Sequence, residues 1–203
     1  MLKWLLIFLV FLESLIFFNC AKRGNLTGGL KDTIPPILTN ANPPINNLNF
    51  NSDKITLNFN EYIELKDINE QLIISPPLER KDYKIIPENT VTKKVEIEIN
   101  NKLRENSTFT FNFGSSIVDY NEGNTLPFFN YTFSTGDYID SLKISGFVKD
   151  AYEIDSLNFV SIHLYPIDSV FNDSTIYNQK PFYVGNTLDS VYFELNSLAP
   201  GKY

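Results

Sequence analysis

The chain has 203 residues, of which 43% are hydrophobic, 14% aromatic and 20% charged, and its formal net charge is -7. This composition excludes a disordered chain, and the acidic balance without a Lys/Arg-rich stripe excludes a nucleic-acid partner. The length and composition therefore predict a folded protein with one large or two small domains.

The first predicted element is an apolar segment at the N-terminus. Lys3 precedes an apolar run over residues 4–18, which is interrupted by one glutamate and one serine and leads to Cys20, the only cysteine. A short basic end followed by about 7–15 apolar residues is typical of an export signal, whereas a spanning helix needs about 18 or more. We expect a signal helix within a lipoprotein signal peptide, residues 1–19, and a thioether-linked lipid at Cys20.

The residues before Cys20 depart from the bacterial lipobox, which prefers leucine three positions before the cysteine and a small residue directly before it. Phe17, Phe18 and Asn19 occupy these positions. An ordinary signal cleaved nearby and an uncleaved anchor therefore stay open as alternatives. With lipid attached, two or more acyl chains would hold the protein on a membrane that it does not span, at about 0.8 kcal/mol for each buried methylene.

A glycine-containing polar segment follows the cysteine. It has no hydrophobic periodicity, so we expect a flexible tether over residues 20–33. Pro35 and Pro36 then open the first domain, which we expect to cover residues 34–137.

This domain alternates apolar and polar side chains in short segments. The alternating apolar residues are Ile55, Leu57 and Phe59; Val95, Ile97 and Ile99; Phe109, Phe111 and Phe113; and Phe129, Tyr131 and Phe133. A period of two predicts half-buried strands, and turn-forming residues separate them. The expected fold is all-β, a sandwich of about 100 residues. The best helical candidate, residues 65–72, is about two turns and too short to be stable alone.

The alternation resumes after Gly136. Its apolar residues are Leu142, Ile144 and Val148; Val160, Ile162 and Leu164; Phe182 and Val184; and Val191, Phe193 and Leu195. We expect a second, smaller β-domain over residues 141–203. Because residues 198–203 look like a turn leading into a strand, its sheet is expected to be incomplete, with an open edge.

Several of these segments resemble known families. Residues 32–137 resemble the bacterial Ig-like domain first described in S-layer proteins of the SbsA type. The matching segments are DTIPP at residues 32–36, ITLNFNE at 55–61, the late turn at 119–127 and YTFSTGD at 131–137. Residues 144–150 and 198–203 resemble the first strand and late turn of carboxypeptidase-regulatory-like, transthyretin-like sandwiches.

The combination behind a lipoprotein signal resembles a group of envelope lipoproteins common in Bacteroidetes-type bacteria. This resemblance implies an Ig-like β-sandwich, a partial second sandwich and a place on the outer membrane. It brings no catalytic residues.

Few residues have side chains suited to catalysis or metal binding. By alternation with Ile162 and Leu164, the single histidine, His163, faces away from the core, and nothing in the sequence supplies an orienting partner. A zinc site needs three or four His or Cys ligands, which this chain cannot supply. Glu96 and Glu98 alternate with core residues, as on a solvated strand face. We expect no catalytic residue, no metal site, no cofactor and no enzymatic activity.

Two further signals concern calcium and glycosylation. The turn at residues 119–124 is rich in oxygen ligands, but Gly123 falls one position early for an EF-hand, so a plain hairpin turn is the favoured interpretation. Asp-Ser or Asp-Thr before an apolar residue recurs along the chain and resembles the O-glycosylation acceptor of Bacteroidetes-type envelopes. Thr33, in the tether, is the candidate O-glycosylation site.

Two functions remain. The first is a non-catalytic, lipid-anchored envelope protein that acts as a scaffold or spacer for an unidentified envelope protein. The second is a surface polysaccharide-binding module in which Tyr62, Tyr120 and Tyr138 stack against sugar faces. Clustering of these tyrosines on one exposed surface would favour the second function, and dispersal the first. We favour the first because most aromatic residues occupy core-facing positions.

The residues after Cys20 indicate on which side of the outer membrane the anchored protein lies. Ala21, Lys22 and Arg23 lack the acidic character that resembles a surface-export signal in related envelope lipoproteins. We therefore expect an outer-membrane anchor that faces the periplasm rather than the cell surface.

Overall fold

The computed structural model describes residues 3–4, 29–88, 90–151, 160–168, 170–187 and 191–203. The chain divides into two compact units, Met1–Asp32 and Thr33–Tyr203. The predicted signal peptide and Cys20 fall almost wholly outside the described residues, as does most of the predicted tether. Among the helices of the described part, none has the length and apolar character to cross a membrane.

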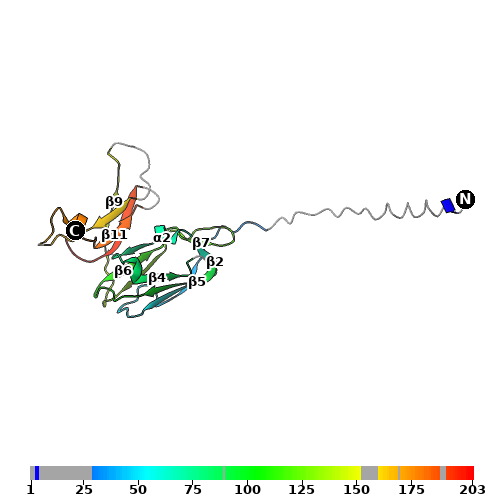
Figure 1. Cartoon of the computed structure of the whole chain (residues 1–203), viewed down its shortest axis with the longest axis horizontal. Helices are drawn as coiled ribbons and strands as arrows, with labels where there is room; N and C mark the ends of the chain where they lie inside the picture. Colours follow the sequence, from blue (N-terminus) through cyan, green and yellow to red (C-terminus); the bar gives the residue numbers. More distant parts are fainter. Residues whose placement is uncertain (1–2, 5–28, 89, 152–159, 169, 188–190) are drawn as a thin grey trace. The chain divides into compact units, whose positions relative to one another are not determined.

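The second unit is built mainly of strands (Figure 1). The strands are β1 (Leu38–Asn42), β2 (Lys54–Leu65), β3 (Ile73–Ser75), β4 (Tyr83–Ile86), β5 (Thr92–Ile99), β6 (Thr108–Asn112), β7 (Ile117–Asp119), β8 (Asn130–Ser134), β9 (Leu142–Phe147), β10 (Ser161–Leu164), β11 (Tyr183–Asn186) and β12 (Tyr192–Leu198). The short helices are α2 (Ile68–Gln71), η1 (Arg80–Asp82) and α3 (Thr175–Asn178). The all-β prediction is confirmed, and the helical candidate at residues 65–72 contributes a single turn.

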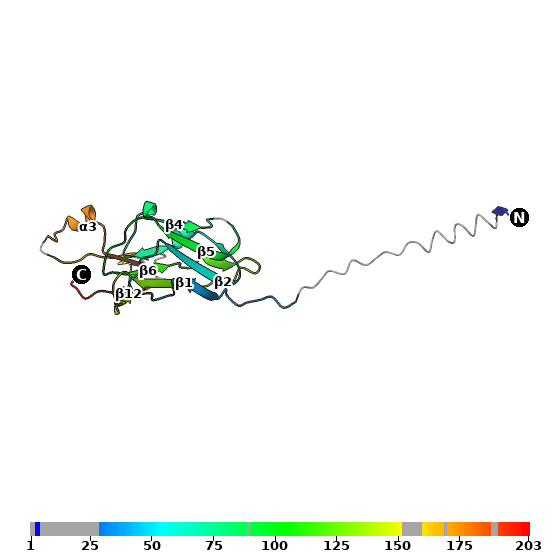
Figure 2. The same ribbon diagram turned by 90° about the horizontal axis from the view of Figure 1, so that it is seen from below.

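Two antiparallel sheets form a sandwich. One has the strand order β1-β2-β5-β4 (Figure 2), with β7 also paired to β2, and the other has the order β3-β6-β8. The predicted alternation places one face of each sheet toward the other. On β2, Ile55, Leu57 and Phe59 are buried, and on β6, Phe109 and Phe111 are buried. These residues belong to one continuous hydrophobic core between the sheets.

Phe133 lies at the centre of this core. Its side chain is 0% exposed. Its ring centroid lies 4.0 Å from that of Phe50, 5.6 Å from Phe109, 6.1 Å from Phe111 and 5.9 Å from Tyr131. The Tyr131 hydroxyl donates a hydrogen bond to the Pro43 carbonyl at 2.8 Å, and burial raises the pKa of this phenol. Aromatic packing along the inner face of β6 and β8 therefore fills this part of the core.

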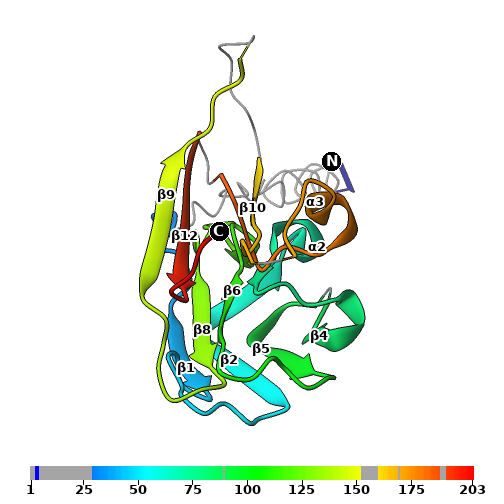
Figure 3. The ribbon, with the colours of Figure 1, turned by 90° about the vertical axis from the view of Figure 1, so that its left-hand side faces the viewer.

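The four strands after residue 140 pair as two antiparallel ladders, β9 with β12 and β10 with β11 (Figure 3). They belong to the same compact unit as the sandwich. Ser75 Oγ accepts a hydrogen bond from Val184 N at 3.2 Å, Thr108 Oγ1 donates to Asp140 Oδ2 at 2.9 Å, and the Arg104 guanidinium lies 4.1 Å from the Phe182 ring centroid. The ladders are therefore attached directly to the sandwich. A separate second sandwich over residues 141–203 stays a prediction.

Burial in these ladders differs from the sequence pattern in two places. The most buried residue of β11 is Tyr183, at 3% exposure, rather than Phe182 or Val184. Tyr183 packs with Leu195 and Leu198 of β12 in a small second core. On β9, Leu142 and Ile144 are exposed, although Leu195 and Leu198 of the paired strand β12 are buried. Alternation predicts which residues share a face, but not whether that face is covered.

Candidate functional site

The residues singled out in the sequence are not brought together. Cys20 lies outside the described residues, and Thr33 is exposed. His163 is exposed on β10 between two half-buried neighbours, as its alternation predicts. Glu96 Oε1 lies 3.0 Å from both Lys54 Nζ and Lys94 Nζ, and hydrogen bonds from these lysines, Lys54 first, lower its pKa. In the described ranges, no three His, Cys, Asp or Glu residues are grouped as metal ligands.

The turn at residues 119–124 is organised by the carboxylate of Asp119. Its Oδ1 accepts hydrogen bonds from Glu122 N at 2.7 Å and Gly123 N at 3.3 Å, and its Oδ2 accepts one from Asn124 N at 2.7 Å. These backbone donors, Glu122 first, lower the pKa of Asp119. Gly123 has a φ of 81°, the positive value that the hairpin interpretation predicts. Because the carboxylate is committed to backbone donors, the turn is a structural feature.

The three candidate tyrosines separate into a pair and a single residue. Tyr120 N donates a hydrogen bond to the Tyr62 carbonyl at 2.9 Å, and the two side chains are 57% and 55% exposed. Lys93 Nζ lies 5.0 Å from the centroid of the Tyr62 ring. Tyr138 follows β8, and a 2.7 Å hydrogen bond from Asn49 N to the Gly136 carbonyl places this segment beside the residues that precede β2. Tyr62 lies toward the other end of β2, about 25 Å along the strand at about 3.3 Å per residue.

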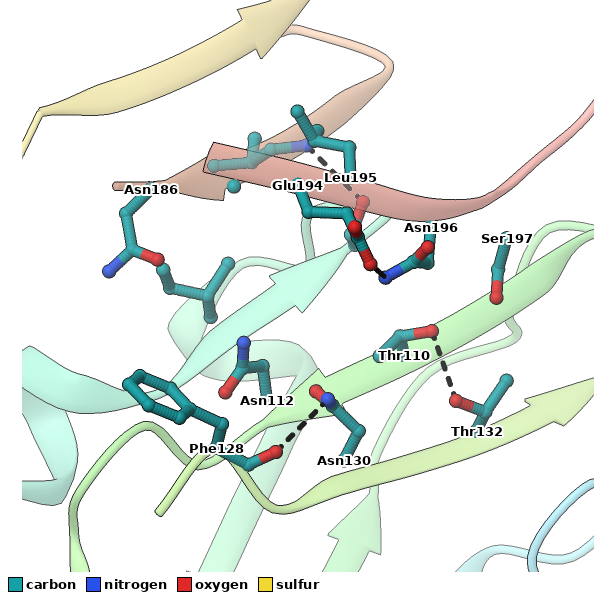
Figure 4. Close-up of a pocket in the computed structure, with 14 residues that line it drawn as sticks. Thr110, Asn112, Phe128, Asn130, Thr132, Asn186, Glu194, Leu195, Asn196 and Ser197 are labelled. Atoms are coloured by element: carbon teal, nitrogen blue, oxygen red, sulfur yellow. Dashed lines mark hydrogen bonds between the residues drawn. The ribbon is translucent and has the colours of Figure 1, made fainter. Parts of the chain in front are cut away.

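A polar cleft lies between the sandwich and the C-terminal ladders (Figure 4). Its volume is about 290 Å³. The floor is the outer face of the sheet β3-β6-β8, and it consists of two cross-strand rows. One row is Ser75, Thr110 and Thr132, and the other is Ile73, Asn112 and Asn130. The floor therefore carries hydroxyl and amide groups from three adjacent strands, with the phenylalanines of β6 turned to the opposite, core side.

The roof comes from β11 and β12. It includes Asn186 from β11 and Glu194, Asn196 and Ser197 from β12. Gly185 also lines the roof, and a Cβ at this position would lie 3.0 Å from Leu195 Cγ. Glycine therefore allows β11 to approach Leu195 of β12, which belongs to the small second core. The cleft exists only because the ladders pack on the sandwich.

Glu194 is the only ionisable residue that lines the cleft among the described residues. Its carboxylate accepts hydrogen bonds from Asn196 Nδ2 at 2.8 Å and from the Tyr192 hydroxyl at 2.9 Å, and Lys143 Nζ lies 3.7 Å away. These contacts, with Asn196 first, lower the pKa of Glu194. The cleft therefore presents one anionic group that is partly balanced by a neighbouring lysine.

The floor groups keep hydrogen-bonding capacity. Asn112 Oδ1 accepts a hydrogen bond from Gly114 N at 2.8 Å, while its Nδ2 donates to no described residue. In Figure 4 this nitrogen points up from β6 toward the roof. Thr110 and Thr132 share one hydrogen bond at 3.2 Å between their hydroxyls. Hydroxyls and amides can both donate and accept, so this surface can satisfy a ligand that does the same.

Sequence reasoning missed the cleft. The alternation on β6 and β8 already assigns Thr110, Asn112, Asn130 and Thr132 to the face opposite the phenylalanines. That signal gives the floor as a polar outer face. It does not show that β12 lies over it, because the covering strand is far away in the sequence.

The comparisons with known proteins give one finding. The family model of the bacterial Ig-like domain matches residues 32–135. No curated protein and no solved structure matches the chain. The matched segment covers both sheets of the sandwich, including the floor of the cleft, and ends before the strands that form its roof.

Proposed function

Because this chain belongs to the bacterial Ig-like domain family, whose domains are structural or interaction modules and generally not enzymes, we propose that it is a non-catalytic scaffold anchored in the cell envelope. Lipid on Cys20 anchors it to the outer membrane, and it faces the periplasm. The sandwich carries the C-terminal ladders and presents them to another envelope protein.

Strand β9 is the observation that carries the scaffold proposal. Among the described residues, β9 pairs with β12 on one side only, and Leu142, Ile144 and Phe147 are 51%, 39% and 71% exposed. An edge strand with exposed apolar side chains is a template for pairing with another chain. The hydrogen bond from Thr108 to Asp140, two residues before β9, attaches this edge to the sandwich. A partner that adds a strand here would bury these side chains.

Anchoring is tested by intact mass and membrane fractionation of the wild type beside Cys20→Ala. We expect an acylated mass in the outer-membrane fraction, lost in the variant, and protection from protease in intact cells. An unmodified wild-type mass would refute lipid attachment, and digestion in intact cells would refute the periplasmic orientation.

The partner surface is tested by photo-crosslinking in cells with a photoreactive residue at position 147. Position 84, an exposed residue on β4, is the matched control. We expect a discrete crosslinked product from position 147 alone. Equal products at both positions would contradict a partner at β9.

A surface polysaccharide-binding module is the second candidate. The adjacency of Tyr62 and Tyr120, both of them exposed, favours it, whereas the distant Tyr138 does not join them. A Tyr62→Ala/Tyr120→Ala variant would lose polysaccharide binding if this pair forms the platform.

A further inference from the structure

The polar cleft has the chemistry of a saccharide site. Its floor offers hydroxyls from Ser75, Thr110 and Thr132 and amides from Asn112 and Asn130, on three adjacent strands. A sugar hydroxyl both donates and accepts hydrogen bonds, as these groups do. Lysine and arginine, which an anionic ligand would need, are absent from the described lining. The charge of the lining therefore selects against anions.

The roof adds an acceptor that suits the same ligand. Glu194 is held by Asn196 and Tyr192 with its carboxylate ionised, and one of its oxygens lies 3.7 Å from Lys143 Nζ. An ionised carboxylate accepts strong hydrogen bonds from neutral hydroxyls. An anionic ligand would meet repulsion at this point.

Phe128 supplies an apolar surface at one end of the floor, where Figure 4 shows its ring beside Asn112. Its φ is 53°, a conformation that bulky residues rarely adopt. Hydrogen bonds from Phe128 N to the Gly114 carbonyl at 2.8 Å and from Asn130 Nδ2 to the Phe128 carbonyl at 3.1 Å hold it. Strained residues that their surroundings hold in place cluster at ligand sites. An aromatic ring beside amides and hydroxyls matches the apolar face and the hydroxyl edge of a sugar.

We propose that this cleft binds an uncharged saccharide chain, with a sugar unit between the β6–β8 floor and the β12 roof and its C–H face on Phe128. The volume of about 290 Å³ lies near the lower end of small-molecule sites, which suits a short stretch of a chain. The inference deepens the polysaccharide alternative and rests on it, but it assigns binding to this cleft instead of the tyrosine pair. It does not depend on lipid attachment.

The test measures binding by isothermal titration calorimetry with the full chain in a detergent that has no sugar headgroup. The probes are neutral tetrasaccharides (maltotetraose, cellotetraose, mannotetraose and xylotetraose) and the acidic tetragalacturonate. We expect saturable binding of at least one neutral probe and none of tetragalacturonate. Absence of saturation by every neutral probe, or preferred binding of tetragalacturonate, would overturn the proposal.

Asn112→Asp is the decisive variant. It keeps the oxygen that accepts from Gly114 N and removes the amide donor that points into the cleft, so the backbone contact is preserved. We expect binding to weaken by about tenfold or more, because one good hydrogen bond is lost and a second anion appears beside Glu194. Thr132→Val, which removes a floor hydroxyl, is expected to weaken it by about three- to tenfold.

Asn58→Asp is the matched control. Asn58 lies on β2, in the other sheet, and is not part of the cleft lining. Unchanged affinity in Asn58→Asp beside the loss in Asn112→Asp supports the cleft, and equal affinity in all three variants refutes it. If Tyr62→Ala/Tyr120→Ala abolishes binding while Asn112→Asp retains it, the polysaccharide alternative holds at the tyrosine pair and the cleft proposal fails.

Discussion

Replacing Phe133 by alanine tests whether the aromatic core holds the sandwich together. Phe133 is fully buried and has four aromatic neighbours with centroids between 4.0 and 6.1 Å. Buried Phe→Ala changes cost about 3–5 kcal/mol because transfer energy is lost and a cavity remains. The surrounding strands are closely packed, which limits how far the cavity can collapse, so we expect a cost within this range.

The expected loss converts to a fall in Tm of about 6–20 °C, at about 2–4 °C per kcal/mol for a chain of this size. Circular dichroism during heating, checked by urea unfolding, measures it. A Phe133→Leu variant should lie between the wild type and Phe133→Ala, because it refills most of the volume.

Phe147→Ala is the matched control for the same chemical change. Phe147 is 71% exposed, and its ring contacts that of Tyr192, at 5.3 Å between centroids. We expect a cost below about 1 kcal/mol. If Phe133→Ala and Phe147→Ala lower stability equally, the assignment of Phe133 to the centre of the core is refuted.

Two further predictions concern pH. Backbone hydrogen bonds lower the pKa of Asp119 below its ordinary value of 3.8, so the stabilisation is present above that pH and lost as the pH falls through the lowered pKa. Urea unfolding should therefore show Asp119→Asn less stable than wild type at pH 7, with a smaller gap at pH 3; an equal gap at both pH values would contradict this. Burial raises the pKa of Tyr183 from 10.0 to about 12, so its contribution is present below pH 10 and lost as the pH rises toward 12. Tyr183→Phe, which removes the acceptor for Ala199 N, should cost about 1–3 kcal/mol at pH 7 and weaken the dependence of stability on pH between 10 and 12, and an unchanged alkaline profile would refute the assignment.

The strands and their inward faces were largely predictable from sequence. The phenylalanines of β6 and the apolar residues of β2 and β5 lie in the core as alternation predicts. The predictions for β9 and β11 were less accurate, since Ile144 is exposed and Tyr183 is the buried residue of its strand. Sandwich strands have a second sheet opposite them, whereas the face of β9 that carries Leu142 and Ile144 stays exposed.

The candidate sites likewise differ in whether local residues or distant segments form them. Gly123 and Asp119 form a turn within a few residues, and local chemistry was enough to predict it. The pairing of Tyr62 with Tyr120 depends on the contact of β2 with β7. The cleft depends on a longer-range contact, in which β12 carries Glu194 over the face that holds Asn112.

The amino-acid pattern alone is enough to predict that the chain is all-β and which side chains of each strand share a face. The reason is that alternation is a local property of extended backbone, and burial of one face selects apolar residues at every second position. Which faces are covered, and by which strand, becomes known from the folded structure. Packing between distant segments sets that choice, so the polar face of β6 and β8 became the floor of a cleft when β11 and β12 packed over it.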